Sequence, residues 1–256
     1  MNLMEEKMKN GSQHFPDWMS RTVQLLGEAR CEKLKQSHVL VAGMGGVGSV
    51  AAEALVRTGI GRITIIDNDV VQASNINRQV PALHSTIARS KVEVMEARLL
   101  DINPELEIRA LQIYLNDETR DEVFSEKYDF VVDAIDTLSP KIFLIEKVCG
   151  MGIPLASSMG SGGKTDPTKI TITDFKKTYN CRLAYILRKK LRKLGINGGF
   201  KVVFSTEFVD KELMFTTENE PNKKSVHGTV PYIPSIFGNM LASIVVDGIT
   251  GASEPV

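Results

Sequence analysis

The sequence predicts an α/β fold of the Rossmann-like, doubly wound type, with a mostly parallel sheet and a C-terminal extension containing a basic helix and additional strands. Two observations support this prediction. Short apolar segments alternate with segments of helical periodicity from residue 21 to residue 160, an order that builds parallel sheets with right-handed crossovers. The stretch "GMGGVG" follows the first predicted strand and opens the next predicted helix, which is the context of a phosphate-binding turn.

Each element is predicted from its periodicity and its boundaries. Runs rich in β-branched residues predict strands, and apolar residues three and four positions apart predict helices, which stop at Gly59 and before Pro104. The expected strands are residues 38–43, 62–67, 106–115, 128–136 and 153–160, and the expected helices are residues 21–38, 49–59, 87–104, 117–127 and 139–152. Beyond residue 160 we expect one strand within residues 161–178, a basic helix at 181–195, a strand at 200–209 and then a polar loop.

These elements are expected to form one domain with additions at both ends. Residues 1–20 are polar and Met-rich and predict a flexible N-terminal arm. Residues 21–160 form the expected nucleotide-binding core, and residues 161–256 form a C-terminal extension of the same domain.

The composition is that of a globular protein with balanced charge. The chain has 256 residues, of which 43% are hydrophobic and 24% charged, which is enough to bury a sizeable core. Its 31 basic residues balance 31 acidic ones. Net charge therefore does not predict a DNA partner, and any basic patch must be local.

The cysteines and the apolar segments predict a cytoplasmic protein. Cys31, Cys149 and Cys181 are widely spaced and predict neither a disulfide framework nor a CxxC zinc pair. The N-terminus has no apolar segment typical of a signal peptide. The most apolar stretch, residues 232–251, is interrupted by polar residues and proline, so we expect a buried helix and no membrane association.

The glycine-rich turn predicts a site for a phosphate-bearing nucleotide. Gly43, Gly45, Gly46 and Gly48 lie where backbone N–H groups can approach phosphate oxygens and a helix N-terminus adds partial positive charge. Asp67 ends the next predicted strand, where a carboxylate can bind ribose hydroxyls. The motif alone does not distinguish a redox dinucleotide from ATP.

The polar loop after that strand favours a triphosphate. It contains Asp69, Asn75, Arg78 and Gln79, and Lys91 follows on the next predicted helix. A triphosphate carries more negative charge than a dinucleotide, and its reaction spreads charge over several oxygens that cationic side chains stabilise. Arg78 and Lys91 are therefore candidate catalytic residues, although either one alone would be interpreted as a solvated surface charge.

A further acidic position is expected to bind a metal ion. Asp136 ends the predicted strand "VVDAID", at the carboxyl edge of the sheet, where ligands bind in such folds. Magnesium prefers carboxylate and phosphate oxygens, so Asp136 is a candidate Mg²⁺ ligand; the alternative is an N-cap of the following helix. Asp133, in the same predicted strand, is expected to point to the same face.

Taken together, these motifs resemble the ubiquitin-activating-type adenylating enzymes. The resemblance rests on "GMGGVG", "IDNDVV", "NINRQ", "ARSKVE" and "DAID" and extends from about residue 21 to residue 167, more weakly to the end. Within that family, "NINRQVPALH" and "SSMGSGGKTDPTKITITD" resemble the enzymes that dehydrate threonylcarbamoyladenosine in tRNA. The resemblance implies that ATP converts a carboxylate of the tRNA substrate to an acyl-adenylate, which then cyclises.

The resemblance also implies roles for individual residues. Arg78, Lys91 and Asp136 would be catalytic, with Asp136 organising Mg²⁺. Arg21 would be donated across the interface of a homodimer, to which the apolar C-terminal segment would contribute. The residues expected to bind ATP are Arg21, Gly43, Gly45, Gly46, Gly48, Asp67, Asp69, Asn75, Arg78, Lys91 and Asp136.

A local basic region predicts where tRNA binds. Eleven Lys and Arg residues lie between Lys164 and Lys201, against two Asp residues. Cationic side chains bind the phosphates of nucleic acids, and Tyr179 and Tyr185 are available for stacking on bases. A charge run of this kind is also typical of a solvated helix face.

Three alternatives to the dehydratase remain open. Sulfur-carrier members of the family usually have two CxxC pairs and a cysteine in a crossover loop, and this sequence has neither, which favours the dehydratase. The alternatives are a sulfur-carrier adenylyltransferase of the molybdopterin or thiamine type, an NAD-dependent oxidoreductase, and a nucleotide-binding scaffold that serves a cysteine desulfurase as its sulfur acceptor.

Overall fold

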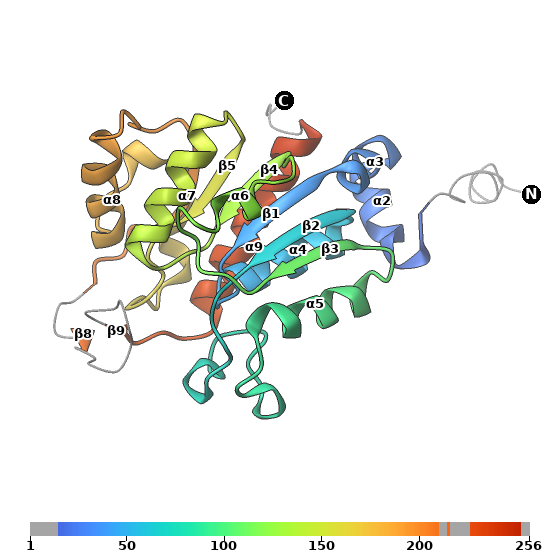
Figure 1. Cartoon of the computed structure of the whole chain (residues 1–256), viewed down its shortest axis with the longest axis horizontal. Helices are drawn as coiled ribbons and strands as arrows, with labels where there is room; N and C mark the ends of the chain where they lie inside the picture. The colour runs from blue at the N-terminus through green and yellow to red at the C-terminus, as the bar shows by residue number, and fades with distance from the viewer. Residues whose placement is uncertain (1–14, 210–213, 216–225, 252–256) are drawn as a thin grey trace, which may run out of the picture.

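The computed structural model describes residues 15–209, 214–215 and 226–251. Seven strands form one sheet in the order β3-β2-β1-β4-β5-β7-β6 (Figure 1). Neighbouring strands are parallel except β6 and β7, which are antiparallel. The strands are β1 (His38–Ala42), β2 (Arg62–Ile66), β3 (Glu107–Leu111), β4 (Phe130–Asp133), β5 (Leu155–Ser158), β6 (Ile170–Asp174) and β7 (Lys201–Ser205). The predicted doubly wound, mostly parallel fold is confirmed.

Helices cover both faces of this sheet (Figure 1). One face packs against α4 (Gly48–Thr58), α5 (Lys91–Ile102) and α9 (Tyr232–Thr250). The other packs against α6 (Arg120–Val123), α7 (Leu138–Gly150) and α8 (Arg182–Arg192). The short 3-10 helices are η1 (Asp17–Met19), η2 (Ala73–Asn75), η3 (His84–Thr86), η4 (Pro167–Lys169) and η5 (Phe175–Lys177).

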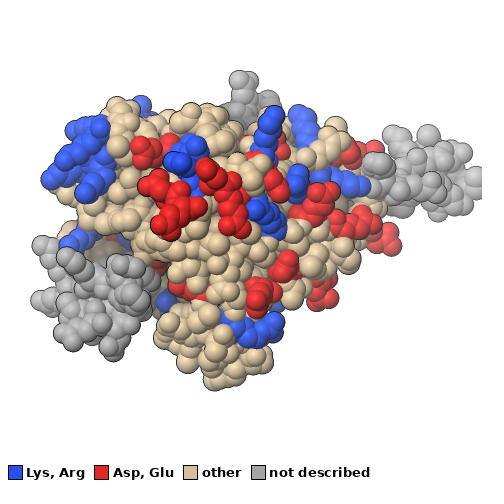
Figure 2. All heavy atoms as spheres, in the orientation of Figure 1, with Lys and Arg blue, Asp and Glu red and all other residues tan. Residues whose placement is uncertain are grey.

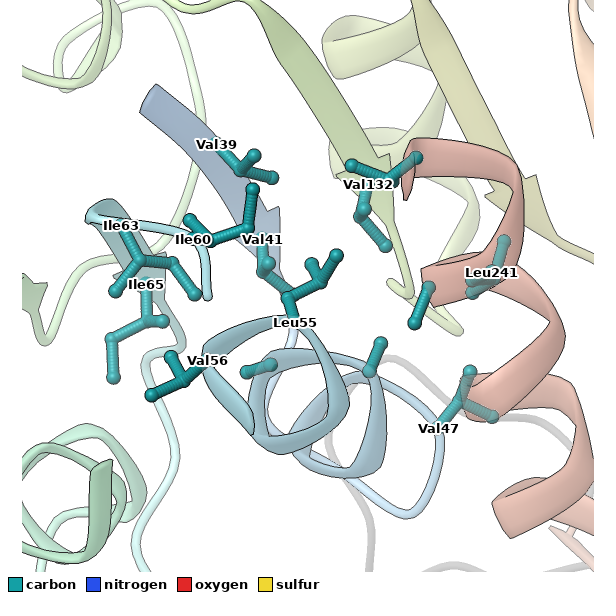
Figure 3. Close-up of a cluster of buried hydrophobic side chains, with 14 of the residues drawn as sticks. Val39, Val41, Val47, Leu55, Val56, Ile60, Ile63, Ile65, Val132 and Leu241 are labelled. Carbon is teal, nitrogen blue, oxygen red and sulfur yellow. The ribbon is translucent and has the colours of Figure 1, made fainter. Parts of the chain in front are cut away.

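The composition of β1 shows why the sheet is covered on both sides. Successive side chains of a strand point to opposite faces, and all five residues of β1 are buried. Val39 and Val41 join the cluster under α4 and α9, where Figure 3 shows them facing Leu55 and its neighbours. Leu40 and Ala42 join the cluster under α7 and α8. Strands buried on both faces are mostly apolar, and in β1 the four residues after His38 fit this pattern.

The N-terminal segment differs from the prediction. We expected one helix over residues 21–38, but two are present, α2 (Ser20–Leu26) and α3 (Glu28–Gln36). They are separated by Gly27, whose φ of 82° is incompatible with a continuous helix. Residues 1–14 of the predicted arm lie outside the described residues, whereas Met19 is buried in η1.

Two further boundaries differ for local reasons. The helix expected from residue 87 begins at Lys91, since Ala88 has a φ of 67°. The strand expected to end at Asp136 ends at Asp133, so Asp136 lies in the loop before α7. The predicted polar loop also contains a short antiparallel pair, β8 (Met214–Phe215) and β9 (Val226–His227).

The apolar C-terminal segment forms α9, which packs against α4 and the sheet. Among the described residues it is the one helix whose length and hydropathy would allow it to cross a membrane, and 50% of its apolar window is buried inside the protein. Core helices of soluble proteins often meet the same criteria, and the buried helix predicted for this segment is present.

Candidate functional site

The glycine turn connects β1 to α4 at the point where the strand order reverses. β1 lies between β2 and β4, and the chain proceeds outward from β1 in both directions. In open α/β sheets, ligands bind beyond the carboxyl ends of the strands at such a point. The fold therefore places the turn where the sequence predicted a nucleotide site.

The four glycines of the turn serve two purposes. A Cβ atom at Gly43 would lie 2.9 Å from the carbonyl oxygen of Ala134, and one at Gly48 only 1.8 Å from that of Gly43. A Cβ at Gly46 would lie 2.9 Å from the carbonyl oxygen of Arg78. At Gly45, by contrast, the nearest atom would be Nε2 of Gln79 at 3.7 Å, an ordinary contact. Packing therefore requires three of the glycines, while Gly45 presents a backbone that another molecule can approach.

Asp67 ties the turn to the end of β2. Its Oδ2 accepts a hydrogen bond from the backbone N–H of Met44 at 2.6 Å, and its Oδ1 accepts one from the N–H of Asp69 at 2.8 Å. Burial raises the pKa of the Asp67 carboxyl above its usual value, although the nearby charge of Lys91 opposes the rise. This carboxylate lies beside the glycine turn, where the sequence predicted contact with a ribose.

Lys91 and Asp69 form an ion pair next to Asp67. Nζ of Lys91 lies 2.8 Å from Oδ2 of Asp69, and the lysine side chain is only 6% exposed, against 58% for the aspartate. The interpretation of Lys91 as a solvated surface charge is thus wrong. An ammonium group has three N–H donors, so Lys91 can hold Asp69 and still donate to a phosphate.

Asn75 and Arg78 lie in the polar loop after β2. Asn75 is buried, and its Oδ1 accepts a hydrogen bond from the N–H of Gln72, which shapes η2. The guanidinium of Arg78 is partly exposed and donates through one nitrogen to the carbonyl of Ser74 and to Oδ1 of Asn77. Its remaining donors are available for an anionic ligand.

The two aspartates near the end of β4 have different surroundings. Asp136 is exposed in the loop before α7, whose N-cap is Thr137, so Asp136 is not the helix cap. Asp133 is fully buried in an ion pair with Lys141, so the expectation that both carboxylates share a face is wrong. Among the described residues there is no group of three or more His, Cys, Asp or Glu side chains suited to a metal ion.

Arg21 and the glycine turn of the same chain lie at opposite ends of α4. Arg21 lines a groove of about 450 Å³ together with Thr58, at the C-terminal end of α4, and Asp247, near the end of α9. The glycine turn precedes the other end of α4. The structure therefore does not bring Arg21 into the site formed by its own chain.

Only part of the predicted basic region is exposed on the surface of the protein. Lys164 is buried and donates to the carbonyl of Glu207, and burial lowers the pKa of its ammonium. The prediction that Lys164 contributes to a basic surface is wrong. Figure 2 shows Lys and Arg side chains gathered over α8. We define the basic face of α8 as its exposed residues Arg182, Tyr185, Lys189, Lys190 and Arg192 together with Lys193, the C-cap of the helix.

Sequence reasoning missed two residues that contact Asp133 beneath the site, Lys141 and Ser157. Lys141 is fully buried against Asp133, and Ser157 donates to the same carboxylate at 2.6 Å. Gln79, in the polar loop, lies beside Gly45, and its Oε1 is buried without a hydrogen-bond partner among the described residues. The one available signal was Lys141 itself, a charge within the apolar segment "SPKIFLIE".

Comparison with known proteins decides the family. The family model described as the ThiF family matches residues 19–256. The chain belongs to the ThiF family. This ThiF-family protein is 42% identical over 234 residues to the tRNA threonylcarbamoyladenosine dehydratase of Bacillus subtilis, covering 89% of this chain and 92% of that protein. It is 41% identical over 204 residues to the Escherichia coli protein of the same name, covering 74% of this chain and 75% of that one.

Solved structures agree with this result. The crystal structure of the E. coli tRNA N6-threonylcarbamoyladenosine dehydratase in complex with ATP superposes on this ThiF-family protein with a TM-score of 0.84. The two chains are 34% identical, and the match covers 94% of this chain and 97% of the other. The predicted resemblance to adenylating enzymes is confirmed at the level of family and fold.

Proposed function

We propose that this protein is an ATP-dependent dehydratase that cyclises the threonylcarbamoyl group of N6-threonylcarbamoyladenosine in tRNA. One observation carries the proposal. A glycine turn with an open backbone at Gly45, flanked by Asp67, Lys91 and Arg78, occurs in a chain similar to dehydratases along almost its whole length.

The reaction requires activation because hydroxide is a poor leaving group. The substrate carboxylate attacks the α-phosphorus of ATP, pyrophosphate leaves, and an acyl-adenylate results. A nitrogen or oxygen of the same threonylcarbamoyl group then attacks the activated carbonyl carbon, AMP leaves with the former carboxylate oxygen, and a ring closes. Intramolecular attack has a high effective molarity, so the protein needs no nucleophile of its own.

The side chains around the turn fit a nucleotide. Asp67 keeps lone pairs for ribose hydroxyls after accepting two backbone N–H groups. The open face of Gly45 and the donor Nε2 of Gln79 beside it mark the side from which phosphates approach. Arg78 and Lys91 stabilise the negative charge that develops on the phosphates, with Asn75 and Asp69 holding the loop in shape.

Asp136 is the proposed ligand for Mg²⁺. Its carboxylate is exposed beyond the carboxyl end of β4, beside the turn, and magnesium is commonly held by one or two carboxylates together with substrate phosphates. A bound Mg²⁺ would neutralise phosphate charge.

The basic face of α8 is the proposed docking surface for tRNA. Arg182, Lys189 and Arg192 have no ion-pair partner among the described residues, and Tyr185 is 62% exposed on the same helix. Tyr179, also exposed, packs edge-on against Phe204. Cations without acidic partners bind phosphate backbones, and exposed aromatic rings stack on bases.

A homodimer would complete the site. Arg21 is distant from the turn of its own chain, so its proposed contact with ATP requires a second copy. The groove beside Arg21 includes Leu25, which is 83% exposed, and residues of α9, and it is the proposed dimer contact. We further propose residues 21–160 as the adenylation core, a cytoplasmic location and, as a separate interaction, a cysteine desulfurase partner.

Two of the three thiols, Cys31 and Cys149, favour this function over sulfur-carrier activation. Burial raises the pKa of Cys31 and of Cys149 above the usual value of a thiol, whereas thioester and persulfide chemistry requires a thiolate. Neither residue lies near the glycine turn in the fold: Cys31 is in α3 and Cys149 at the end of α7.

A product assay tests the proposal. The protein is incubated with ATP, Mg²⁺ and threonylcarbamoylated tRNA, and the nucleosides are analysed by mass spectrometry. We expect AMP and a modified nucleoside lighter by one water. Pyrophosphate exchange stimulated by a small sulfur-carrier protein but not by tRNA would replace this proposal with the adenylyltransferase, and tight NAD binding without ATP turnover would replace it with the oxidoreductase.

A further inference from the structure

A fully buried ion pair contacts the segment that carries Asp136. Asp133 and Lys141 have no exposed surface, and Nζ of Lys141 lies 2.7 Å from Oδ2 of Asp133. Transferring two charges out of water is costly, and a well-packed apolar pair often serves folding equally well. The position of this pair therefore points to a role beyond stability.

The contacts of the pair converge on one residue, Ile135. Oδ1 of Asp133 accepts a hydrogen bond from the N–H of Ile135 at 3.1 Å, and Nζ of Lys141 donates to the carbonyl of Ile135 at 2.9 Å. Both peptide groups that flank Ile135 are thus held by buried charges. The second of these peptide groups joins Ile135 to Asp136.

The same segment is fixed to the glycine turn on its other side. The N–H of Ala134 donates to the carbonyl of Ala42 at 2.9 Å, and the carbonyl of Ala134 packs against Gly43 so closely that no Cβ fits there. Ser157 on β5 also donates to Asp133. The network therefore connects β4, β5 and α7 to the loop beside the turn.

We propose that Asp133 and Lys141 are positioning residues, which hold residues 134–136 against the glycine turn and so place the carboxylate of Asp136 for the metal–ATP complex. The inference rests on the proposed role of Asp136. It predicts that the two buried residues influence Mg²⁺-dependent ATP binding without touching either ligand.

The test uses the double variant Asp133→Asn/Lys141→Met. It buries no charge and keeps an acceptor for the N–H of Ile135, but it removes the donor to the carbonyl. Calorimetry measures ATP affinity with and without Mg²⁺. We expect the gain in affinity from Mg²⁺ to fall about 10-fold, as when the partner of a metal ligand is removed, while ATP alone binds as tightly as before. Amide hydrogens of residues 135–137 should exchange faster.

Two further variants separate the possible causes. Leu144→Ala removes a buried side chain from the same helix, and it should lower stability without changing the gain from Mg²⁺; an equal loss there would overturn the inference. Asp136→Asn tests the proposed metal role directly. If Asp136→Asn keeps the gain in ATP affinity from Mg²⁺, Asp136 is not the metal ligand and the inference is overturned as well. If Asp136→Asn loses the gain but the double variant keeps it, only the inference is overturned. A double variant that does not fold would also overturn it, since the network would then serve folding.

Discussion

The fold restricts the choice of residue in the glycine turn and on the basic face of α8 in different ways. In the turn, Gly43, Gly46 and Gly48 each lie where a single added carbon would meet backbone or side-chain atoms. On α8 the buried residues Ala184, Leu187 and Leu191 anchor the helix, while its exposed cations have no ion-pair partner among the described residues. The comparison teaches that close contacts fix the residue type at each of these glycines, whereas packing does not restrict the exposed positions of α8.

The largest expected effect is at Gly48. In Gly48→Ala the new methyl group would lie 1.8 Å from the carbonyl oxygen of Gly43, so we expect the free energy of unfolding to fall by about 3 kcal/mol. Urea unfolding followed by circular dichroism measures it. Gly45→Ala is the matched control and should fold normally but bind ATP weakly. If the two variants were equally stable, packing would not require glycine at position 48 any more than at position 45.

The next largest effect is expected at Arg78. Removing this guanidinium takes away donors for the charged phosphates, so Arg78→Ala should lower tRNA-stimulated ATP–pyrophosphate exchange about 100- to 1,000-fold. Arg89, exposed in the same loop, provides the control, and Arg89→Ala should keep most activity. Near-normal exchange in a folded Arg78→Ala protein would exclude Arg78 from the reaction.

A moderate effect is expected on α8. Changing Lys189, Lys190 and Lys193 to Glu should weaken tRNA binding about 10- to 100-fold, reduce its salt dependence and leave ATP affinity intact. The same change at three exposed lysines elsewhere, Lys33, Lys35 and Lys127, is the control for net charge. Equal losses in both triple variants would show that tRNA responds to the overall charge and not to this helix.

The smallest effect is expected at His38, outside both regions. Burial lowers the pKa of its imidazole below the usual value, and the charge of Arg62 lowers it further. The unfolded chain therefore binds the proton more readily than the folded one. The stabilisation is fully present above the unfolded pKa of about 6.5 and is lost as pH falls through the folded pKa. Melting temperatures at pH 8 and pH 5 should differ less in His38→Gln than in the natural protein, and an identical difference would contradict the assignment.

The sequence predicted the elements of the core because their signals are local. The glycine turn, β2 and α4 were recognisable from periodicity and from stop signals such as Gly59. Asp67 was predicted from its distance to the turn, whereas Lys91 was predicted because a triphosphate needs cationic side chains. The ion pair of Lys91 with Asp69 was not predicted, since it depends on how the loop returns to α5.

The rest depended on tertiary structure. Asp133 and Lys141 are eight positions apart, and their pairing follows from the packing of α7 on β4. Lys164 was counted among surface cations because charge patterns carry no information about burial. Gly27 divides a predicted helix because its backbone adopts a positive φ, which an isolated glycine in a helical pattern does not reveal.

The packing of α9 links the last part of the chain to the first loop. Pro234 lies against Gly46, and Gly238 approaches Val47 so closely that no side chain fits between the two helices. A ribosome adds about 5–20 residues per second. Roughly 10–40 s would therefore pass between the synthesis of α4 and the synthesis of α9. During that interval the apolar flank of α4 that α9 later covers would be exposed to water, and such surface promotes aggregation of a nascent chain.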